Sequence, residues 1–166
     1  MKILITGSNG LLGQKLVYKL RNKSHVTCIA TARGDNRLVQ QQGYVYEKLD
    51  ITDKKNVEDV FTKHLPDVII NTAAMTNVDA CETDREACWL MNATAVENQV
   101  RVLETLKQNN KNYNPHFIHL STDFIFDGSH GPLDENETPN PLSYYAESKL
   151  AAEKTVQASN LDWSIA

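Results

Sequence analysis

The sequence predicts an α/β fold, a doubly wound parallel sheet with helices on both faces. Short apolar, β-branched runs alternate with longer helical patterns along the chain. A glycine-rich turn, 7–13, follows the first apolar run directly. The longest helical pattern, Arg85–Asn110, has apolar residues at spacings of three and four, the period of a helix with one buried face. Such alternation implies right-handed crossovers between parallel strands.

The strands and helices follow in order along the chain. The expected strands are Lys2–Thr6, Val26–Ala30, Val45–Leu49, Asp67–Asn71, His116–Ser121 and the beginning of one in Leu161–Ala166. The expected helices are Leu11–Arg21, Asn36–Gln42, Lys54–His64, Arg85–Asn110 and Ser143–Ala158. The buried face of the longest helix is expected to carry Leu90, Ala93, Val96, Val100 and Leu103. The segment Gly128–Pro141, with three prolines and two glycines, is predicted to be a loop.

Composition narrows the class of protein. The 166 residues suit one compact domain, 1–166, and the net charge of −4 argues against a nucleic-acid or anionic-membrane surface. No stretch approaches the roughly 20 apolar residues of a membrane span, so we expect a cytoplasmic protein. The cysteines Cys28, Cys81 and Cys88 fit no metal or redox spacing, so we expect reduced thiols and no metal site. Because the chain stops within an apparent strand, we expect a shortened piece of a longer protein.

The turn after the first strand reads GSNGLLG. Here Gly7 permits the tight turn, Gly10 lets backbone approach a pyrophosphate, and Gly13 allows close packing of helix on strand. The N-terminus of the following helix then offers free N–H groups to phosphate. Glycine spacing alone also fits a tight turn without a ligand, but its place between the first strand and helix favours a Rossmann-type dinucleotide site.

The region after the second strand bears on the cofactor. A site for NAD places an acidic residue near the end of this strand to hold the ribose hydroxyls. Here the chain reaches Arg33 first, and an arginine is suited to pair with the 2′-phosphate of NADP. This favours NADP(H) over NAD(H). A solvated loop arginine is the open alternative, and Asp35 keeps NAD(H) open.

Two later segments carry candidate catalytic groups. Tyr145 and Lys149 are one helical turn apart, and Thr122 follows a strand at the sheet edge where ligands of such folds bind. Reduction of a carbonyl needs a proton at oxygen, and a nearby ammonium is expected to lower the pKa of the tyrosine. The Thr122 hydroxyl is placed to stabilise charge on that oxygen. An exposed tyrosine and lysine on a surface helix are the alternative, which the glycine turn makes less favourable.

These blocks together resemble the extended short-chain dehydrogenase/reductase family, within it the dTDP-4-dehydrorhamnose reductases. The resemblance rests on Thr6–Gly13, Asn71–Asp79, Ser121–Gly128 and Pro141–Leu150, in family order and spacing. It implies an NAD(P)-dependent oxidoreductase that reduces the keto group of a nucleotide-linked 4-keto-6-deoxy sugar. The fold it implies includes a C-terminal substrate domain that this chain lacks. We therefore expect the 166 residues alone to bind cofactor weakly and to turn over little substrate.

The resemblance also implies roles for individual residues. Gly10, Leu11 and Leu12 would contact the pyrophosphate, Asp50 and Ile51 would flank the adenine, and Ala73, Ala74 and Met75 would lie towards the nicotinamide. Thr122, Tyr145 and Lys149 would be catalytic, Asp123 would act beside the sugar, and Asn92 would order the site. Plainer alternatives are a turn formed by Asp50, Thr52 and Asp53, tight packing at Ala73 and Ala74, and a helix-surface amide at Asn92.

One position separates branches of the family. The related dehydratases carry Thr-Asp-Glu, whose acid and base eliminate water, whereas Phe124 follows Asp123 here. Phenylalanine cannot abstract a proton, so the sequence favours reduction. An epimerase, a reductase of a GDP- or UDP-linked sugar, and a non-catalytic regulatory subunit like the methionine adenosyltransferase beta subunit remain alternatives. The expected partners are a nucleotide sugar and, as in relatives, a second copy in a homodimer.

Overall fold

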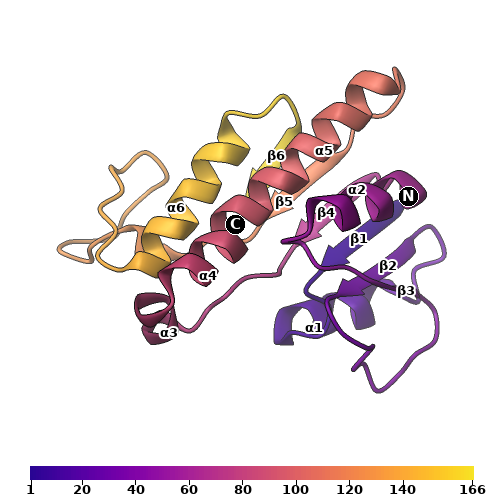
Figure 1. Ribbon diagram of the computed structural model, residues 1–166, viewed down its shortest axis with the longest axis horizontal. Coiled ribbons are helices and arrows are strands. Elements are labelled where there is room, and N and C mark those ends of the chain that lie inside the picture. Colours follow the sequence, from indigo (N-terminus) through magenta and orange to yellow (C-terminus); the bar gives the residue numbers. More distant parts are fainter.

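The computed structural model describes residues 1–166 and contains one six-stranded parallel sheet in the order β3-β2-β1-β4-β5-β6 (Figure 1). The strands are β1 Lys2–Thr6, β2 Thr27–Ala32, β3 Val45–Lys48, β4 Val68–Asn71, β5 His116–His119 and β6 Asp162–Ile165. The helices are α1 Leu11–Leu20, α2 Lys54–His64, α3 Val78–Thr83, α4 Arg85–Trp89, α5 Ala95–Asn109 and α6 Tyr144–Gln157. The strand order reverses between β1 and β4, which makes this the point where ligands of such sheets bind. The predicted fold class is confirmed.

Helices cover both faces of the sheet. On one face α2, α5 and α6 bury the larger hydrophobic core, which includes Phe61, Ile69, Leu103 and Phe117 (Figure 1). On the other face α1 packs on β1 and β2 in a smaller cluster around Val17. The alternation of buried and half-buried residues in β4 and β5 follows from the strand period of two, since each strand has one side in the larger core.

The expected helix at Asn36–Gln42 is wrong, because this segment is a loop. Side chains hold its backbone instead: Asn9 accepts from the Arg37 N–H at 2.9 Å, and Asn36 accepts from the Leu38 N–H at 3.1 Å. Such bonds compete with the helical ladder and win in a short polar segment. The loop still contributes to the smaller core through Leu38, which is buried.

The long helix predicted at Arg85–Asn110 is divided. A π-helical turn, Leu90–Thr94, separates α4 from α5, and Leu90 is exposed rather than buried. The short helix α3 is an addition to the prediction, and β5 ends at His119 rather than at Ser121. The other expected strands and helices are confirmed to within two residues at their ends.

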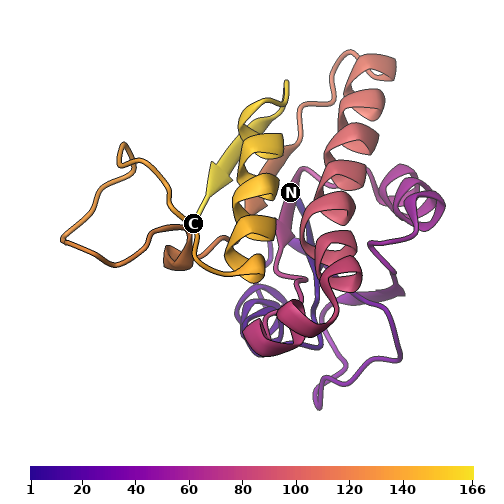
Figure 2. The same ribbon diagram turned by 60° about the vertical axis from the view of Figure 1, so that its left-hand side comes forward.

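The segment between the short 3₁₀ turn Asp123–Ile125 and α6 contains neither helix nor strand, as predicted for Gly128–Pro141. It extends away from the sheet beside the end of the chain (Figure 2). None of the helices combines the length and the apolar character that crossing a bilayer requires.

Candidate active site

Two hollows adjoin at the carboxyl ends of the central strands. The Arg33 hollow, about 250 Å³, is lined by Gly7, Gly10, Ala32, Arg33, Leu49, Asp50, Ile51, Thr72, Ala73, Ala74 and Met91. The Tyr145 hollow, about 340 Å³, is lined by Gly10, Leu11, Leu12, Gly13, Asn71, Thr72, Ala74, Thr76, Leu120, Ser121, Tyr145 and Lys149. Gly10, Thr72 and Ala74 line both. The two hollows therefore form one groove that passes over the glycine turn.

The glycine turn has no space for side chains. Gly7 has a φ of +67°, and a Cβ there would lie 2.8 Å from the backbone of Ala73. A Cβ on Gly13 would lie 2.4 Å from the Gly7 carbonyl oxygen. Both positions therefore require glycine. Gly7 needs it for its positive φ and for its close contact with the backbone of Ala73, and Gly13 needs it only for its close contact with the Gly7 carbonyl.

The N-terminus of α1 is open towards the groove. Its N-cap is Gly10, which has no side chain to bond the first N–H groups, and its first turn contains no acidic residue. The next two side chains, Leu11 and Leu12, are 82% and 46% exposed and line the Tyr145 hollow. Free N–H groups, a positive helix end and exposed apolar side chains fit the pyrophosphate of a dinucleotide.

The two residues that could select between NADP(H) and NAD(H), Arg33 and Asp35, lie in different surroundings. Arg33 lines it, whereas Asp35 is fully exposed and forms an ion pair with Lys48 at 2.6 Å. Asp50 also lines the hollow while its carboxylate accepts from the N–H and hydroxyl of Thr52. Asp50 thus forms the turn of the plainer interpretation. It also lines the hollow, so the two interpretations do not exclude each other.

The alanines of the β4 loop lie in the groove, but Met75 does not line either hollow. Ala73 lies with Arg33, and Ala74 lies where the two hollows meet. Met75 is instead held through its backbone by Asn92, at 2.8 Å from its N–H and 3.0 Å from its carbonyl.

Tyr145 begins the buried part of α6 and is 8% exposed. Burial raises its pKa, and the Thr122 side chain acts in the opposite direction by hydrogen bonding. The ring of Phe124 lies edge-on to the Tyr145 ring, with centroids 6.3 Å apart. The expected lowering of this pKa by Lys149 is wrong for this structure, because the lysine amine bonds elsewhere.

Lys149 is 3% exposed, and burial lowers its pKa to about 8, with Glu153 acting to raise it. Its Nζ donates to the Leu120 carbonyl and lies 3.4 Å from His119 Nε2. A lysine whose pKa lies so close to neutrality is a group that can exchange a proton, which is a common property of functional sites.

Thr122 and Asp123 lie outside the groove but beside it. The Thr122 hydroxyl accepts from the Phe124 N–H and so starts the 3₁₀ turn. Asp123 and Phe124 line a third hollow, about 660 Å³, together with Leu133 and Leu142 of the extended loop. The site residues thus divide into a dinucleotide groove and a neighbouring hollow, with Tyr145 between them.

Asn92 orders the site from within the π-helical turn. It is 1% exposed, and besides Met75 its Nδ2 donates to the Ser148 hydroxyl at 3.1 Å. The turn widens the helix at this point and directs the amide towards both the β4 loop and α6; such turns often mark functional sites. The surface-amide alternative is therefore wrong.

Three buried polar residues were missed as members of the site: Asn71, Gln99 and His119. Sequence signals for them existed. Gln99 interrupts an otherwise apolar helix face between Val96 and Leu103, and Asn71 and His119 end apolar strands. A polar residue at such a position needs partners. Asn71 lines the Tyr145 hollow, and it contacts both Gln99 and His119.

Comparison with known proteins places the chain in a family. The family model of the RmlD substrate binding domain matches residues 1–166. The chain belongs to this family of extended short-chain dehydrogenases/reductases.

Two curated relatives differ in what their names describe, one a reductase and the other a subunit of a methionine adenosyltransferase. The probable low-salt glycan biosynthesis reductase Agl14 of Haloferax volcanii is 32% identical over 163 residues, covering 98% of this chain and 51% of the relative. The methionine adenosyltransferase 2 subunit beta of Xenopus laevis is 31% identical over 160 residues, covering 96% of this chain and 43% of the relative. The chain thus spans about half the length of the relatives it matches.

Solved structures of the family agree with the fold. The dTDP-4-dehydrorhamnose reductase of Clostridium acetobutylicum superposes with a TM-score of 0.83 at 33% identity, over 99% of this chain and 52% of that one. The dTDP-4-dehydrorhamnose reductase of Bacillus anthracis, solved in complex with NADP, has a TM-score of 0.81 at 28% identity, over 99% and 51%. Both of these proteins are named as reductases of a dTDP-linked sugar, and the second was solved with a nicotinamide cofactor.

Proposed function

We propose that this chain is the cofactor-binding part of an NAD(P)H-dependent reductase that acts on the 4-keto group of a nucleotide-linked 6-deoxy sugar, dTDP-4-dehydrorhamnose. The observation that carries the proposal is that Tyr145 and Lys149 line the same groove as the open N-terminus of α1. A bound nicotinamide cofactor would supply the hydride. The chain's own residues then have to hold the sugar and move one proton.

The proton has a short path in this proposal. The Tyr145 hydroxyl donates to the carbonyl oxygen as that oxygen gains charge, while the Thr122 hydroxyl donates a hydrogen bond to the same oxygen. Lys149 lies one helical turn from Tyr145, and burial lowers its pKa to about 8. Asp123 lines the adjoining hollow, where it would bond the sugar hydroxyls. Phe124 supplies no base, so elimination of water is not supported.

The test of the mechanism is Tyr145→Phe in the full-length protein. Cofactor oxidation that depends on dTDP-4-dehydrorhamnose should fall roughly 10²- to 10⁴-fold, the usual contribution of a positioned acid. Tyr144→Phe is the matched control and should keep its rate, because the Tyr144 ring packs against Trp89 and Arg85 outside the groove. Sugar-dependent turnover that survives in Tyr145→Phe would reject the mechanism.

The cofactor is proposed to be NADP(H) rather than NAD(H). Arg33 lines the hollow at the far end of the groove, and Asp35 is engaged with Lys48. Arg33→Ala should weaken NADPH binding by roughly 10- to 100-fold, since a charge-assisted bond contributes about 1.5–3 kcal/mol. The affinity for NADH should stay unchanged. Equal losses for both cofactors would contradict this preference.

A regulatory subunit is the second candidate, favoured by the 31% identity to the methionine adenosyltransferase beta subunit. The Tyr145–Lys149 pair in the groove supports the enzyme instead. Calorimetric titration of the full-length protein with a methionine adenosyltransferase catalytic subunit distinguishes the two. Tight binding without any sugar-dependent cofactor oxidation would favour the regulatory function.

A further inference from the structure

Three neighbouring strands end in buried polar residues that face one another. The sheet register pairs Thr6 of β1 with Asn71 of β4, and Asn71 with His119 of β5. The row of polar side chains formed in this way continues to Lys149, and Gln99 joins it at Asn71. None of these residues is more than 3% exposed. Since solvent cannot complete their hydrogen bonds, each donor in the row must meet an acceptor.

A backbone carbonyl fixes which groups donate and which accept along this row of side chains. The Ala95 oxygen can only accept, and Gln99 Nε2 donates to it at 3.2 Å. If the Gln99 amide were turned over, its oxygen would face that carbonyl oxygen. The same Nε2 donates to Asn71 Oδ1 at 3.3 Å, and the Thr6 hydroxyl donates to Oδ1 at 2.6 Å. Asn71 therefore has to present its Nδ2 donor to His119.

This donor decides which ring nitrogen of His119 carries hydrogen. Burial, and after it the charge of Lys149, lower the pKa of His119 to about 3, so the ring is neutral and has one N–H and one lone pair. Asn71 Nδ2 lies 3.2 Å from Nδ1, which must then hold the lone pair. The hydrogen is on Nε2 and points at Lys149 Nζ, which can accept it only as a neutral amine.

The protonated lysine breaks this pattern. An ammonium can bond His119 only through a lone pair on Nε2, and placing the lone pair there moves the ring hydrogen to Nδ1, against the Asn71 N–H. One hydrogen bond between these side chains is then lost. The Leu120 carbonyl accepts from Nζ in either form and does not discriminate.

We propose that Gln99, Asn71 and His119 are positioning residues that favour the neutral amine of Lys149. Two other titratable groups lie along α6, Tyr145 one turn before Lys149 and Glu153 one turn after it. Glu153 favours the ammonium and is held by the Ser121 hydroxyl. The proposal rests on the proposed function only for its consequence in catalysis, because lysine protonation is a property of the folded chain.

The first test is Gln99→Met in the full-length protein. The substitution changes no charge and touches neither Lys149 nor the groove, but it frees the Asn71 amide to turn over and accept from Nδ1–H. The Lys149 titration, followed by the NMR shift of its labelled ε-carbon, should move up by about one pH unit, the order of one net hydrogen bond. Leu103→Met, at a buried position of the same helix, is the matched control and should not move it. An unmoved titration in folded Gln99→Met overturns the proposal.

The second test observes the histidine directly. Nitrogen NMR of labelled His119 in the full-length protein, assigned with His119→Gln, should show the Nε2–H tautomer above the Lys149 titration and Nδ1–H below it. A ring that keeps Nδ1–H throughout contradicts the proposal. Neither measurement uses a substrate, so failure of the proposed sugar reduction leaves these results standing, and failure here leaves the reductase standing.

Discussion

Gly13 is the residue in the groove with the least space around it. A Cβ there would lie 2.4 Å from one backbone atom and 2.7 Å from another, and neither can move as a flexible side chain would. We predict that Gly13→Ala destabilises the protein by about 1–3 kcal/mol, as overpacking does, and abolishes NADPH binding by displacing the glycine turn. Thermal unfolding and cofactor titration measure both effects.

Gly34 provides the matched control for this change. A Cβ at this position would have no atom within 4 Å, and the backbone has no unusual φ, although Gly34 follows Arg33 in the same region. Gly34→Ala should therefore keep both the unfolding midpoint and the affinity for NADPH. If the two alanine variants lost the same stability and affinity, the short distance between a Gly13 Cβ and the backbone of the glycine turn would not be the cause of the losses.

The buried Lys149 makes stability depend on pH in a defined direction. Burial lowers its pKa from 10.5 to about 8, so between these values the unfolded chain binds more protons and stability rises with pH. Lys149→Met should be more stable than the wild type by about 3 kcal/mol below pH 8, since each pKa unit is worth about 1.4 kcal/mol. Denaturant unfolding across this range should show the difference disappearing by pH 10.5.

The exposed Lys154 of the same helix is the control for this experiment. Lys154→Met should follow the wild type across the whole range. A Lys149→Met variant that was less stable than the wild type at neutral pH would mean that the lysine is compensated in the folded state. The expected result would mean that the buried Lys149 destabilises the folded protein, as is common for residues that serve a function.

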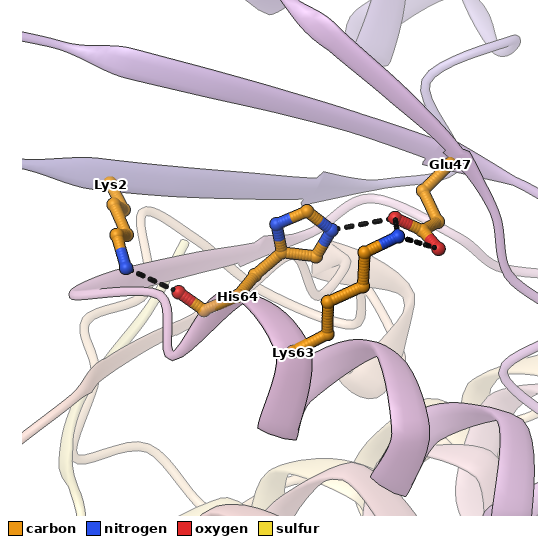
Figure 3. Close-up of polar contacts among 4 residues, drawn as sticks. All are labelled: Lys2, Glu47, Lys63 and His64. Carbon is orange, nitrogen blue, oxygen red and sulfur yellow. Dashed lines mark hydrogen bonds and ion pairs between the residues drawn. The ribbon is translucent and has the colours of Figure 1, made fainter.

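At the scale of elements, the end of α2 is fastened to the sheet by Glu47 of β3 (Figure 3). Its carboxylate accepts from Lys63 at 2.8 Å and from His64 at 2.7 Å, and Lys2 of β1 donates to the His64 carbonyl at 2.8 Å. Burial acts to raise the pKa of Glu47, but the bonds from Lys63 and His64 outweigh it and lower the pKa. The ion pair therefore stabilises the fold above the ordinary carboxyl pKa and is lost as pH falls through the lowered one.

Glu47→Gln should lower the free energy of unfolding by about 0.5–1 kcal/mol at neutral pH, the upper part of the range for surface pairs. The difference from the wild type should shrink as pH falls below the ordinary value of 4.5 and should vanish below the lowered pKa of Glu47. Glu58→Gln, which removes a 3.6 Å contact to Lys55 on the exposed side of α2, should change little. Denaturant unfolding at several pH values compares the three proteins.

The π-helical turn connects α4 to the β4 loop through one amide. Asn92 both accepts from and donates to the Met75 backbone, so Asn92→Asp would set a carboxylate against the Met75 carbonyl. We predict a loss of about 1–3 kcal/mol, the usual effect of an unsatisfied buried group, and weaker cofactor binding. Asn77→Asp is the matched control, because as N-cap of α3 its oxygen still accepts from the Ala80 N–H.

The elements that the sequence predicted correctly are those with a period or a cap of their own. The helix α6 begins at the capping Ser143, and β1 runs straight into the glycine turn, so both were predictable. The loop at Asn36–Gln42 depends on Asn9 and Tyr18, which are remote in sequence. Within the site, the groove could be predicted from local motifs. The contacts among Gln99, Asn71 and His119 could not, because they depend on which residues of neighbouring strands pair with each other.

At the scale of the whole molecule, the two sides of the site differ in how they are built. The dinucleotide groove lies at the carboxyl ends of the central strands, and β4, α1 and α6 contribute residues to it. The hollow beside Asp123 is closed largely by the loop that extends away from the sheet (Figure 2). The first is therefore supported by the core, and the second by a segment with few neighbours.

This difference predicts how the 166 residues behave by themselves. NADPH should bind them weakly but still stabilise them, by about 2.7 kcal/mol at a hundredfold excess over its dissociation constant, because the glycine turn, Tyr145 and Lys149 line the groove within these residues. dTDP-sugar should stabilise the full-length protein and not the 166-residue chain, since the curated relatives are about twice as long and the Asp123 hollow has loop on one side only. Thermal unfolding of both proteins with each ligand measures this. Equal stabilisation of the two by dTDP-sugar would show that these residues suffice to hold the substrate.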